Sequence, residues 1–314
     1  CHDPVIGVAF DGTGYGTDGT IWGGEVLLAD YENFTRFGNI TPFLQIGGDA
    51  SAKEGWRIAV SMIYGYTKDR EQAWEIIEKL GLCSEQESKV QFTMADRKIN
   101  AVISTSVGRL FDAVSAILGI RRQSSFEGEA SMALEFAAEA YEKQKYEWQK
   151  SEGQECEQQK CEQSKYGQQK CEETKCEQLQ YKRQNNEKSD KLVYKNEERF
   201  ILNTKMLVQQ IVEEKMQGAD SSRLAYLFHQ VLAEQITAAC IEARNNSSRN
   251  KVALSGGVFQ NRLLLCLTEE KLEQEGFEVL RHHMIPPNDG GIAIGQAAYG
   301  MWRLNNDGLQ DRRI

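Results

Sequence analysis

The stretch that decides the fold is Val5–Ala29, with the sequence VIGVAFDGTGYGTDGTIWGGEVLLA. An apolar run from Val5 to Phe10 stops at Asp11, a turn rich in Gly, Thr and Asp follows, and a second apolar run begins at Ile21. Two such runs joined by a glycine-containing turn are typical of a β-hairpin. The sequence therefore predicts a hairpin whose bend follows a buried strand.

The bend has the composition of a ligand-binding loop. Gly12, Gly14 and Gly16 lack a Cβ, which allows a ligand to approach backbone N–H groups closely. Asp11, at the end of the first strand, is placed to hold a cation or a water beside such a ligand. A glycine-rich surface hairpin with a solvated Asp11 explains the same residues, so this stretch alone leaves both interpretations open.

Composition limits the function classes. The chain has 314 residues, 40% of them hydrophobic, which is enough for a core with two domains or lobes. A formal charge of −9 and a pI near 5.2 make nucleic acid an unlikely partner. No apolar run is long enough for a transmembrane helix, so we expect no membrane segment. None of the eight cysteines forms a CxxC pair, so we expect a reducing, cytoplasmic location. The start at Cys1 indicates a piece of a longer polypeptide.

A five-residue repeat interrupts the chain from Tyr141 onward (YEKQK YEWQK SEGQE CEQQK and so on). Almost no aliphatic residues occur before Arg199, so we interpret 141–199 as a low-complexity insertion between a first part, 1–140, and a second, 200–314. The repeat also carries evenly spaced cysteines, at positions 156, 161, 171 and 176. A five-residue step turns a helix by about 140°, so neighbouring cysteines share no face and we do not expect a zinc site.

Hydrophobic periodicity predicts the remaining elements. Helices are expected at 49–66, 69–80, 84–100, 105–119, 127–141, 203–216 and 221–245. Short strands are expected at 251–254 and 277–280, and 200–202 fits a short strand or a helix start. His229 lies on a core helix. A histidine there more often packs in the core or lies at the surface than binds a ligand. Asp112 is an acid on a helix that is otherwise apolar on nearly every face, so it needs a partner. That partner is either a hydroxyl group of a ligand or Arg109, which lies at helical spacing for an ion pair with Asp112.

Two later turns have the same character as the hairpin bend. An apolar strand at 251–254 leads into Ser255-Gly256-Gly257 and a helix, a geometry that directs helix N–H groups at an anion or a nucleotide. Asp289 heads a helix of small residues, where a carboxylate caps the helix or binds a metal.

Three Gly/Asp turns at strand ends fit an α/β, two-lobed nucleotide-binding fold of the actin, sugar-kinase and heat-shock-chaperone type. Four motifs, in this order, resemble the C-terminal domain of the HypF family: VAFDGTGYGTDGTIWGGE, GRLFDAVSAILGI, VALSGGVFQNRLL and PPNDGGIAIGQ. That family is the carbamoyltransferase of [NiFe]-hydrogenase maturation, and its domain is similar to the enzyme that installs threonylcarbamoyl groups on tRNA. The resemblance covers nearly everything outside the repeat, and implies a fold that is incomplete at its N-terminus.

The resemblance implies a reaction. An upstream domain makes carbamoyl-adenylate from carbamoyl phosphate and ATP, and this domain passes the carbamoyl group to the C-terminal cysteine of the partner HypE. The product becomes a cyanide ligand of the hydrogenase iron. The upstream HypF domains are missing from this sequence.

The resemblance also implies roles for particular residues. Asp11 and Asp289 would be catalytic, as carboxylate ligands of a divalent metal (zinc, iron or magnesium). The phosphate would lie against Gly12, Thr13 and Gly14. The ribose and adenine would be held by Asp112, Glu127, Gly256, Gly257 and Asn261.

The chain departs from the family at the metal. The family's site also uses two histidines from a segment just upstream of the first strand. The four histidines here are at 2, 229, 282 and 283, and His2 lies too close to the strand to be one of that pair. We therefore expect half of a metal site. A tRNA threonylcarbamoyl transferase-like enzyme, a nucleotide-binding fragment without catalysis and, more weakly, a sugar kinase remain as alternatives.

Overall fold

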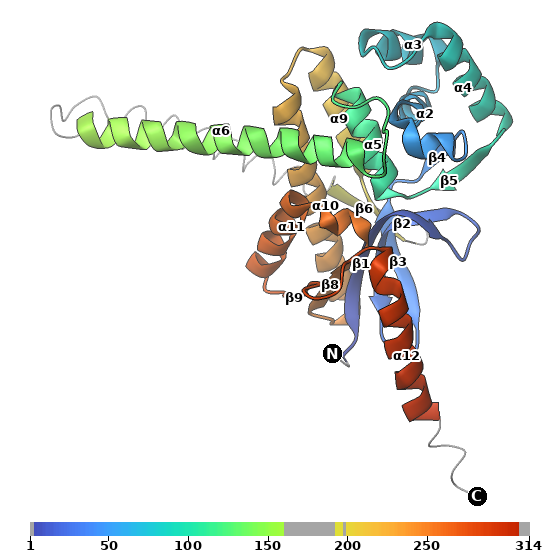
Figure 1. Ribbon diagram of the computed structural model, residues 1–314, viewed down its shortest axis with the longest axis vertical. Helices are drawn as coiled ribbons and strands as arrows, with labels where there is room; N and C mark the ends of the chain where they lie inside the picture. The colour runs from blue at the N-terminus through green and yellow to red at the C-terminus, as the bar shows by residue number, and fades with distance from the viewer. Residues whose placement is uncertain (1–2, 160–191, 197–198, 308–314) are drawn as a thin grey trace, which may run out of the picture.

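The computed structural model describes residues 3–159, 192–196 and 199–307 (Figure 1). Within these ranges, it describes the backbone but not the side chains of 146–159 and 307. Most of the predicted insertion, 160–191, therefore lies outside the described residues, as do the side chains of the repeat's cysteines.

A single mixed sheet organises the described part of the chain. Its main path runs in the order β6-β7-β3-β2-β1-β8-β9, and β4 and β5 pair beside it. The strands are β1 Val5–Tyr15, β2 Ile21–Ala29, β3 Phe34–Ile40, β4 Phe43–Ile46, β5 Ala101–Ser104, β6 Val193–Lys195, β7 Phe200–Leu202, β8 Lys251–Ser255 and β9 Glu278–Leu280. The predicted hairpin is confirmed, because β1 and β2 pair antiparallel from Val5↔Ala29 onward. The sequence analysis did not predict β3, β4, β5 or β6.

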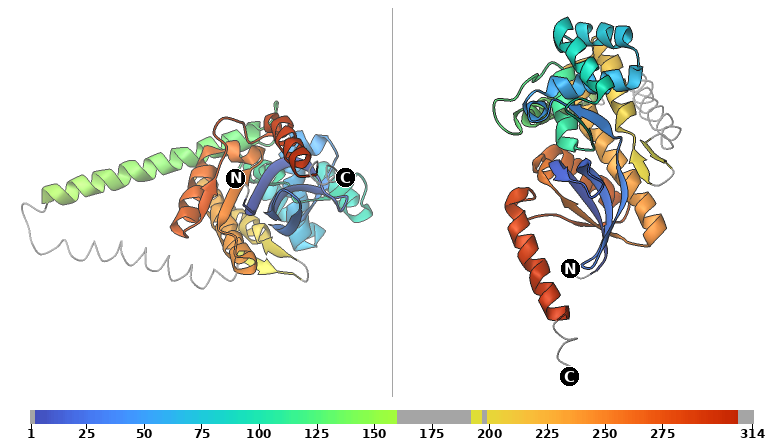
Figure 2. Two further views of the ribbon diagram at one scale, coloured as in Figure 1. Left: turned by 90° about the horizontal axis from the view of Figure 1, so that it is seen from below. Right: turned by 90° about the vertical axis from the view of Figure 1, so that its right-hand side faces the viewer.

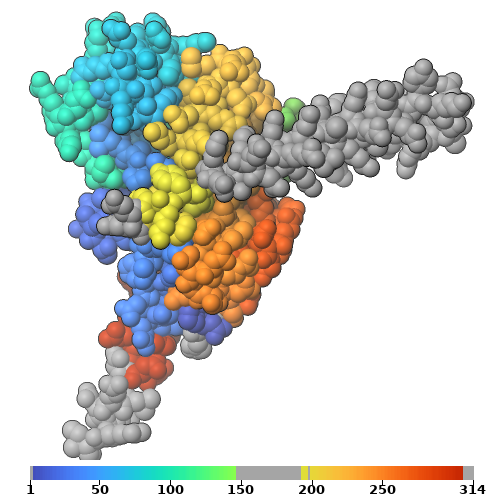
Figure 3. Space-filling model, turned by 180° about the vertical axis from the view of Figure 1, so that it is seen from behind, coloured from blue at the N-terminus to red at the C-terminus, as the bar shows by residue number. Residues whose placement is uncertain are grey.

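Helices pack around this sheet and form a helical region beyond one end of it (Figure 1). They are α1 Ala50–Lys53, α2 Gly55–Thr67, α3 Arg70–Lys79, α4 Glu85–Arg97, α5 Val107–Ile117, α6 Glu129–Gln159, α9 Thr204–Met216, α10 Ser221–Ser247, α11 Arg262–Gln274 and α12 Ile292–Asp307, with 3₁₀ turns η1 Gly257–Gln260 and η2 Asp289–Gly291. Seen from behind, α9 packs against the helices before β5, and α10 and α11 lie below them (Figure 3).

Side-chain caps set several helix starts. Asp69 accepts a hydrogen bond from the backbone N–H of Gln72, and Ser84 and Glu87 form a capping box at α4. Two predicted boundaries were wrong. The helix expected at 49–66 is divided at Glu54, whose backbone leaves the helical region (φ −110°, ψ 77°). The helix expected to end at Tyr141 continues to Gln159, into the repeat.

The core is built from both sides of the repeat. Ile6, Val8 and Phe10 alternate along one face of β1 and are fully buried. Phe111 of α5 packs edge-on against Phe228 of α10, with ring centroids 4.8 Å apart. Burying a side chain of this size stabilises the fold by about 1.5–3 kcal/mol. Residues before and after the insertion thus share one hydrophobic cluster, which holds the ends of β1 and β8 in place.

Candidate functional site

The three predicted Gly/Asp motifs meet beside the C-terminal end of β8. β1 and β8 run parallel, with Ala9 paired to Ser255, so Gly256 follows β8 beside Phe10 and Asp11. Asp11 and Gly12 lie inside β1, at its register shift between Phe10 and Gly14, so the prediction that the first strand ends at Asp11 was wrong and the bend begins after Tyr15. Gly256 has φ +102°, and a Cβ there would lie 2.1 Å from the carbonyl oxygen of Phe10. Only glycine permits this approach. The backbone N–H of Gly256 donates to the carbonyl of Pro287 at 3.0 Å, which brings the Asp289 turn to the same place.

Gly257 lies at the centre of this convergence. A Cβ on Gly257 would lie 3.1 Å from Oδ1 of Asp11 and 3.6 Å from Cβ of Asn288. We call the residues gathered here, Asp11, Gly12, Gly256, Gly257 and Asp289, the strand-end site. The sequence predicted all five, and the structure brings their segments together.

The start of α5 supports the first segment of the strand-end site. Ser106, the N-cap of α5, donates from its hydroxyl to the carbonyl of Gly12 at 2.5 Å. Gly108, the second residue of α5, would place a Cβ 2.8 Å from Cα of Gly12. A Cβ on Gly12 itself would meet nothing within 4 Å. The protein packs closely beneath Gly12 and leaves the other side of its Cα open.

The two carboxylates of the strand-end site are held differently. Oδ1 of Asp11 accepts the N–H of Gly12 at 2.7 Å, and the residue is half-buried. Asp289 is exposed and opens η2, and Asn288 provides the cap by accepting from the N–H of Gly290. The prediction that Asp289 caps this turn is therefore wrong. Carboxylate oxygens suit a divalent cation, but no group of three or more His, Cys, Asp or Glu gathers among the described residues.

Other glycines of the hairpin serve packing. A Cβ on Gly14 would lie 3.1 Å from the carbonyl oxygen of Trp22, and one on Gly16 would lie 2.3 Å from the indole Nε1 of Trp22. Thr13 is exposed and donates from its hydroxyl to the carbonyl of Gly12 at 2.7 Å. Gly14 and Gly16 are thus required by Trp22 itself.

Asp112 is buried on α5 and paired with Arg109, one of the two partners the sequence allowed. Arg109 Nε lies 2.9 Å from Asp112 Oδ2, and Ser131 donates to Oδ1 at 3.4 Å. Burial raises the pKa of Asp112 to about 6, against the lowering effects of Arg109 and Ser131. With 3% of its surface exposed, Asp112 lies behind the site surface.

Asn261 is also engaged within the protein. Its Oδ1 accepts the N–H of Leu264 as the N-cap of α11, and its Nδ2 lies 2.9 Å from Nε2 of His229. His229 is fully buried, which lowers its pKa to about 4, and its Nδ1 lies 2.7 Å from the carbonyl of Ala225. The prediction of a packed core histidine is confirmed.

The N-terminus of α11 already has an anionic partner in this chain. Oε1 of Glu135, on α6, accepts the N–H groups of Arg262 at 2.7 Å and Leu263 at 3.3 Å. Burial raises the pKa of Glu135, while these two hydrogen bonds lower it. The sequence analysis expected these N–H groups to face a nucleotide. It did not identify Glu135, the seventh residue of a helix far away in the sequence, as their partner. Glu127 lies exposed in the loop between α5 and α6.

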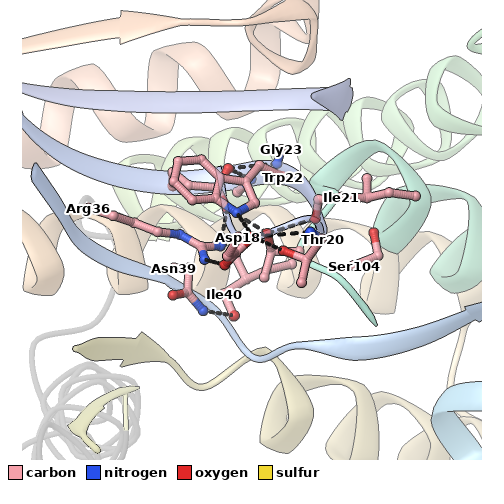
Figure 4. Close-up of polar contacts among 12 residues, drawn as sticks. Asp18, Thr20, Ile21, Trp22, Gly23, Arg36, Asn39, Ile40 and Ser104 are labelled. Atoms are coloured by element: carbon pink, nitrogen blue, oxygen red, sulfur yellow. Dashed lines mark hydrogen bonds and ion pairs between the residues drawn. The ribbon is translucent and has the colours of Figure 1, made fainter. Parts of the chain in front are cut away.

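A second polar group, missed by the sequence analysis, joins β2 to β3 (Figure 4). Glu25 is 2% exposed and accepts from the N–H groups of Gly23 and Gly24 and from Arg36, at 2.6–2.7 Å. Arg36 also pairs with Asp18 at 3.1 Å and stacks 4.0 Å from the ring centroid of Trp22. We call Asp18, Trp22, Glu25, Arg36 and Thr105 the hairpin network.

Asp18 is the best-connected acid of the hairpin network. Partial burial raises its pKa, but hydrogen bonds from Thr20 and Trp22 and the charge of Arg36 outweigh this and lower the pKa to about 2. Arg36 lies 18 residues from Asp18 and 11 from Glu25. No local motif indicates such pairings; only the strand register reveals them.

His282 is a further neighbour of the strand-end site. Its Nε2 lies 3.1 Å from the hydroxyl of Ser255, because β8 and β9 run parallel and both residues follow at their ends. Two cavities, of about 540 and 220 Å³, lie elsewhere and are lined by none of the predicted site residues. No described helix has the length and apolarity needed to cross a membrane.

Comparison with known proteins gives one consistent family. The model "Carbamoyltransferase, Kae1-like Domain, second subdomain" matches residues 7–177 and 159–296. The probable carbamoyltransferase HypF of Methanocaldococcus jannaschii is 28% identical over 294 residues, covering 94% of this chain and 32% of that protein. Carbamoyltransferase HypF of Rhodobacter capsulatus is 30% identical over 304 residues, covering 96% and 33%. The chain spans about a third of these relatives, and 65% of a HypF homologue of Cupriavidus necator.

Solved structures agree with the sequence comparison. Full-length HypF in its phosphate- and nucleotide-bound form matches with a TM-score of 0.74 and 30% identity, covering 97% of this chain and 40% of that one. HypF of T. kodakarensis matches in fold, with a TM-score of 0.68 at 24% identity over 94% and 33%. The predicted fold class is confirmed.

Proposed function

The chain belongs to the HypF family of carbamoyltransferases, and we propose that it carries the carbamoyl-transfer step of such an enzyme. In this proposal it binds carbamoyl-adenylate and passes the carbamoyl group to the C-terminal cysteine of HypE, in the assembly of the cyanide ligands of [NiFe]-hydrogenase. Upstream HypF domains would make the adenylate from carbamoyl phosphate and ATP, in the cytoplasm.

The observation that supports this proposal best is the convergence of Asp11, Gly256-Gly257 and the Asn288–Asp289 turn at the ends of parallel strands. Ligands of open α/β sheets bind at the carboxyl ends of the strands. The open side of Gly12 leaves room for a phosphate beside the backbone, and Gly257 lets the Asp11 carboxylate come close to the chain. A similar full-length HypF has been solved in a phosphate- and nucleotide-bound form, which supports nucleotide binding in this family.

The strand-end site fits part of a divalent metal centre. Asp11 and Asp289 supply hard oxygen donors, and the described residues bring no third ligand of the usual kinds beside them. In the proposal these two carboxylates hold the cation together with groups from outside the described residues. The bound metal would neutralise the phosphate as it leaves. Zinc, iron and magnesium all remain compatible with two carboxylates.

The chain's own residues would position the reaction. Gly12, Thr13 and Gly14 lie along the phosphate side in this proposal, and the rigid contact of Ser106 with Gly12 fixes that segment. The thiolate of the acceptor cysteine attacks the carbamoyl carbon, the bond from that carbon to the phosphate oxygen breaks, and AMP leaves. Asp112 and Asn261 would act from behind the surface, since their side chains are already engaged. Glu127 would reach the nucleoside from the exposed loop.

Isothermal titration of the chain with AMP or ATP, with and without Mg²⁺ or Zn²⁺, tests the site. We expect binding that strengthens with the cation in the parent chain and loses this dependence in Asp289→Asn. Asp49→Asn is the matched control, because Asp49 is exposed and makes no side-chain cap hydrogen bond. If the parent chain binds no nucleotide, the proposed function is wrong; if Asp289→Asn binds like the parent, only the metal assignment is wrong.

The partner is tested separately. HypE is incubated with carbamoyl phosphate, ATP and the chain joined to the upstream domains of a HypF protein, and its C-terminal peptide is weighed by mass spectrometry. We expect a carbamoylated cysteine that disappears with Asp11→Asn. An unmodified cysteine with the parent chain would overturn the assignment of HypE.

A further inference from the structure

Three neighbouring strands of the sheet, β1, β8 and β9, run parallel to one another. Ala9 of β1 pairs with Ser255 at the end of β8, and Figure 2 shows β1, in blue, beside the orange strand β8. β9 ends at Leu280, so His282 follows it by two residues. Ligands of such sheets bind outside the carboxyl ends of the strands. The segment that leaves β9 therefore lies at the edge that carries the strand-end site.

A hydroxyl and an imidazole meet at this edge. Nε2 of His282 lies 3.1 Å from Oγ of Ser255, within the reach that proton transfer needs. Ser255 directly precedes Gly256 of the strand-end site and is half-buried, whereas His282 is exposed. In a neutral imidazole one ring nitrogen accepts a hydrogen bond. With Nε2 as that acceptor the hydroxyl of Ser255 donates, so a proton can pass from Oγ to Nε2.

The other polar groups close to this edge have different tasks. In the proposed function the carboxylates of the strand-end site, Asp11 and Asp289, hold the cation, and its other three members are glycines. His229 is fully buried, and its ring nitrogens face Asn261 and a backbone carbonyl. His282, in contrast, contacts this edge of the sheet and remains accessible to a substrate.

The reaction of the proposed function requires a proton acceptor. The carbamoyl group goes to a cysteine, and the thiolate of a cysteine, not its thiol, is the nucleophile. A free thiol has a pKa of about 8.5, so near neutral pH it is mostly protonated and must lose its proton as it attacks. The leaving AMP is an anion and needs no proton.

We propose that His282 is the general base of the carbamoyl transfer and acts through the hydroxyl of Ser255. The acceptor thiol gives its proton to Oγ of Ser255 while the hydroxyl proton passes to Nε2 of His282. The sulfur bonds to the carbamoyl carbon, the bond from that carbon to the phosphate oxygen breaks, and AMP leaves with the electron pair of that bond. The imidazole then releases its proton to solvent, to which His282 is exposed. The inference rests on the proposed function and assigns it a residue for the proton.

The test measures how fast HypE is carbamoylated by the full chain joined to the upstream domains of a HypF protein, with carbamoyl phosphate and ATP. We expect His282→Ala to slow transfer at least about a hundredfold, the usual contribution of a general base. Free imidazole should recover part of this rate, because it can take the proton from Ser255 in the space that the side chain leaves. The affinity for AMP in calorimetry should stay within about twofold of the parent, because the base acts on the thiol and not on the nucleotide.

His283→Ala is the matched control. His283 is the exposed neighbour of His282 in the sequence, so this variant should transfer at the rate of the parent, with or without imidazole. Ser255→Ala should slow transfer as much as His282→Ala, and the double variant should be no slower than either, because the two residues act as a unit. Thermal unfolding of His282→Ala should match the parent, since the side chain is exposed.

The outcomes separate this inference from the proposed function. If the parent chain leaves the cysteine unmodified, the proposed transfer is wrong and the inference falls with it. If the parent transfers, three results overturn the role of His282 alone. These are an unchanged rate in His282→Ala, a loss of AMP affinity as large as the loss of rate, and a slow rate that imidazole does not raise.

Discussion

The hairpin network and the strand-end site both include residues of the β1–β2 hairpin, but their carboxylates are held in opposite ways. In the hairpin network every carboxylate is paired: Glu25 accepts from two backbone N–H groups and Arg36, and Asp18 from Thr20, Trp22 and Arg36. At the strand-end site Asp11 accepts from its neighbour Gly12, and Asp289 is exposed. Buried charge is tolerated only where it is paired. We therefore expect the first group to stabilise the fold, whereas the carboxylates of the second are available for the ligand of the proposed function.

Removing Arg36 tests the structural half of this comparison and should have the largest effect. Arg36→Met keeps the length of the side chain but leaves Glu25, 3% exposed at its side chain, without its counter-ion. Breaking a buried pair in this way costs about 3–5 kcal/mol in the free energy of unfolding. Urea unfolding followed by circular dichroism measures it.

The control is an exposed ion pair. Arg70 and Asp96 have about half of their side chains exposed, so solvent screens their attraction and Arg70→Met should change stability little. If Arg36→Met is no more harmful than Arg70→Met, the hairpin network does not hold β2 to β3, and its polar groups would be free for another role.

Asp112 lies between the two classes, since it is buried and paired but retains a raised pKa. Burial raises this pKa from 3.8 to about 6, so the folded protein binds the proton more tightly than the unfolded chain. This contribution to stability is fully present below pH 3.8 and is lost as the pH rises through about 6. Two pKa units correspond to about 2–3 kcal/mol.

Asp112→Asn should therefore lack this dependence. We expect the unfolding free energy of the parent chain, relative to the variant, to fall by about 2–3 kcal/mol between pH 4 and pH 7. Urea titrations at both pH values provide the measurement, with Asp49→Asn as the control. A difference that stays constant with pH would mean that Arg109 neutralises Asp112 fully, and would place it with the hairpin network.

The strand-end site was predictable because its residues lie at the ends of apolar runs. Asp11 lies where the first apolar run stops inside β1, Gly256 follows β8, and Asp289 opens η2. The parallel pairing of β1 and β8 then brings Asp11 and Gly256 together. The hairpin network was not predictable, since Arg36 meets Glu25 and Asp18 only through the register of β2 and β3. Asn261 and Glu135 show a further limit. The sequence predicted a helix after Ser255-Gly256-Gly257, but α11 begins only at Arg262, and the anion at its N-terminus comes from a helix more than 100 residues away.

The hairpin glycines give the finest test of the comparison, because one substitution distinguishes the two designs within five residues. At Gly16 an added Cβ would lie 2.3 Å from the indole of Trp22, so Gly16→Ala should destabilise the protein by about 1 kcal/mol or more. At Gly12 the added Cβ would meet nothing within 4 Å. Gly12→Ala should therefore leave stability unchanged or raise it by up to about 1 kcal/mol, because the unfolded chain has lower entropy.

The methyl group of Gly12→Ala would also obstruct a phosphate, so we expect calorimetry to show weaker nucleotide binding by this variant. A loss of stability in Gly12→Ala equal to that in Gly16→Ala would mean that Gly12 serves the fold, and would move it from the strand-end site to the hairpin.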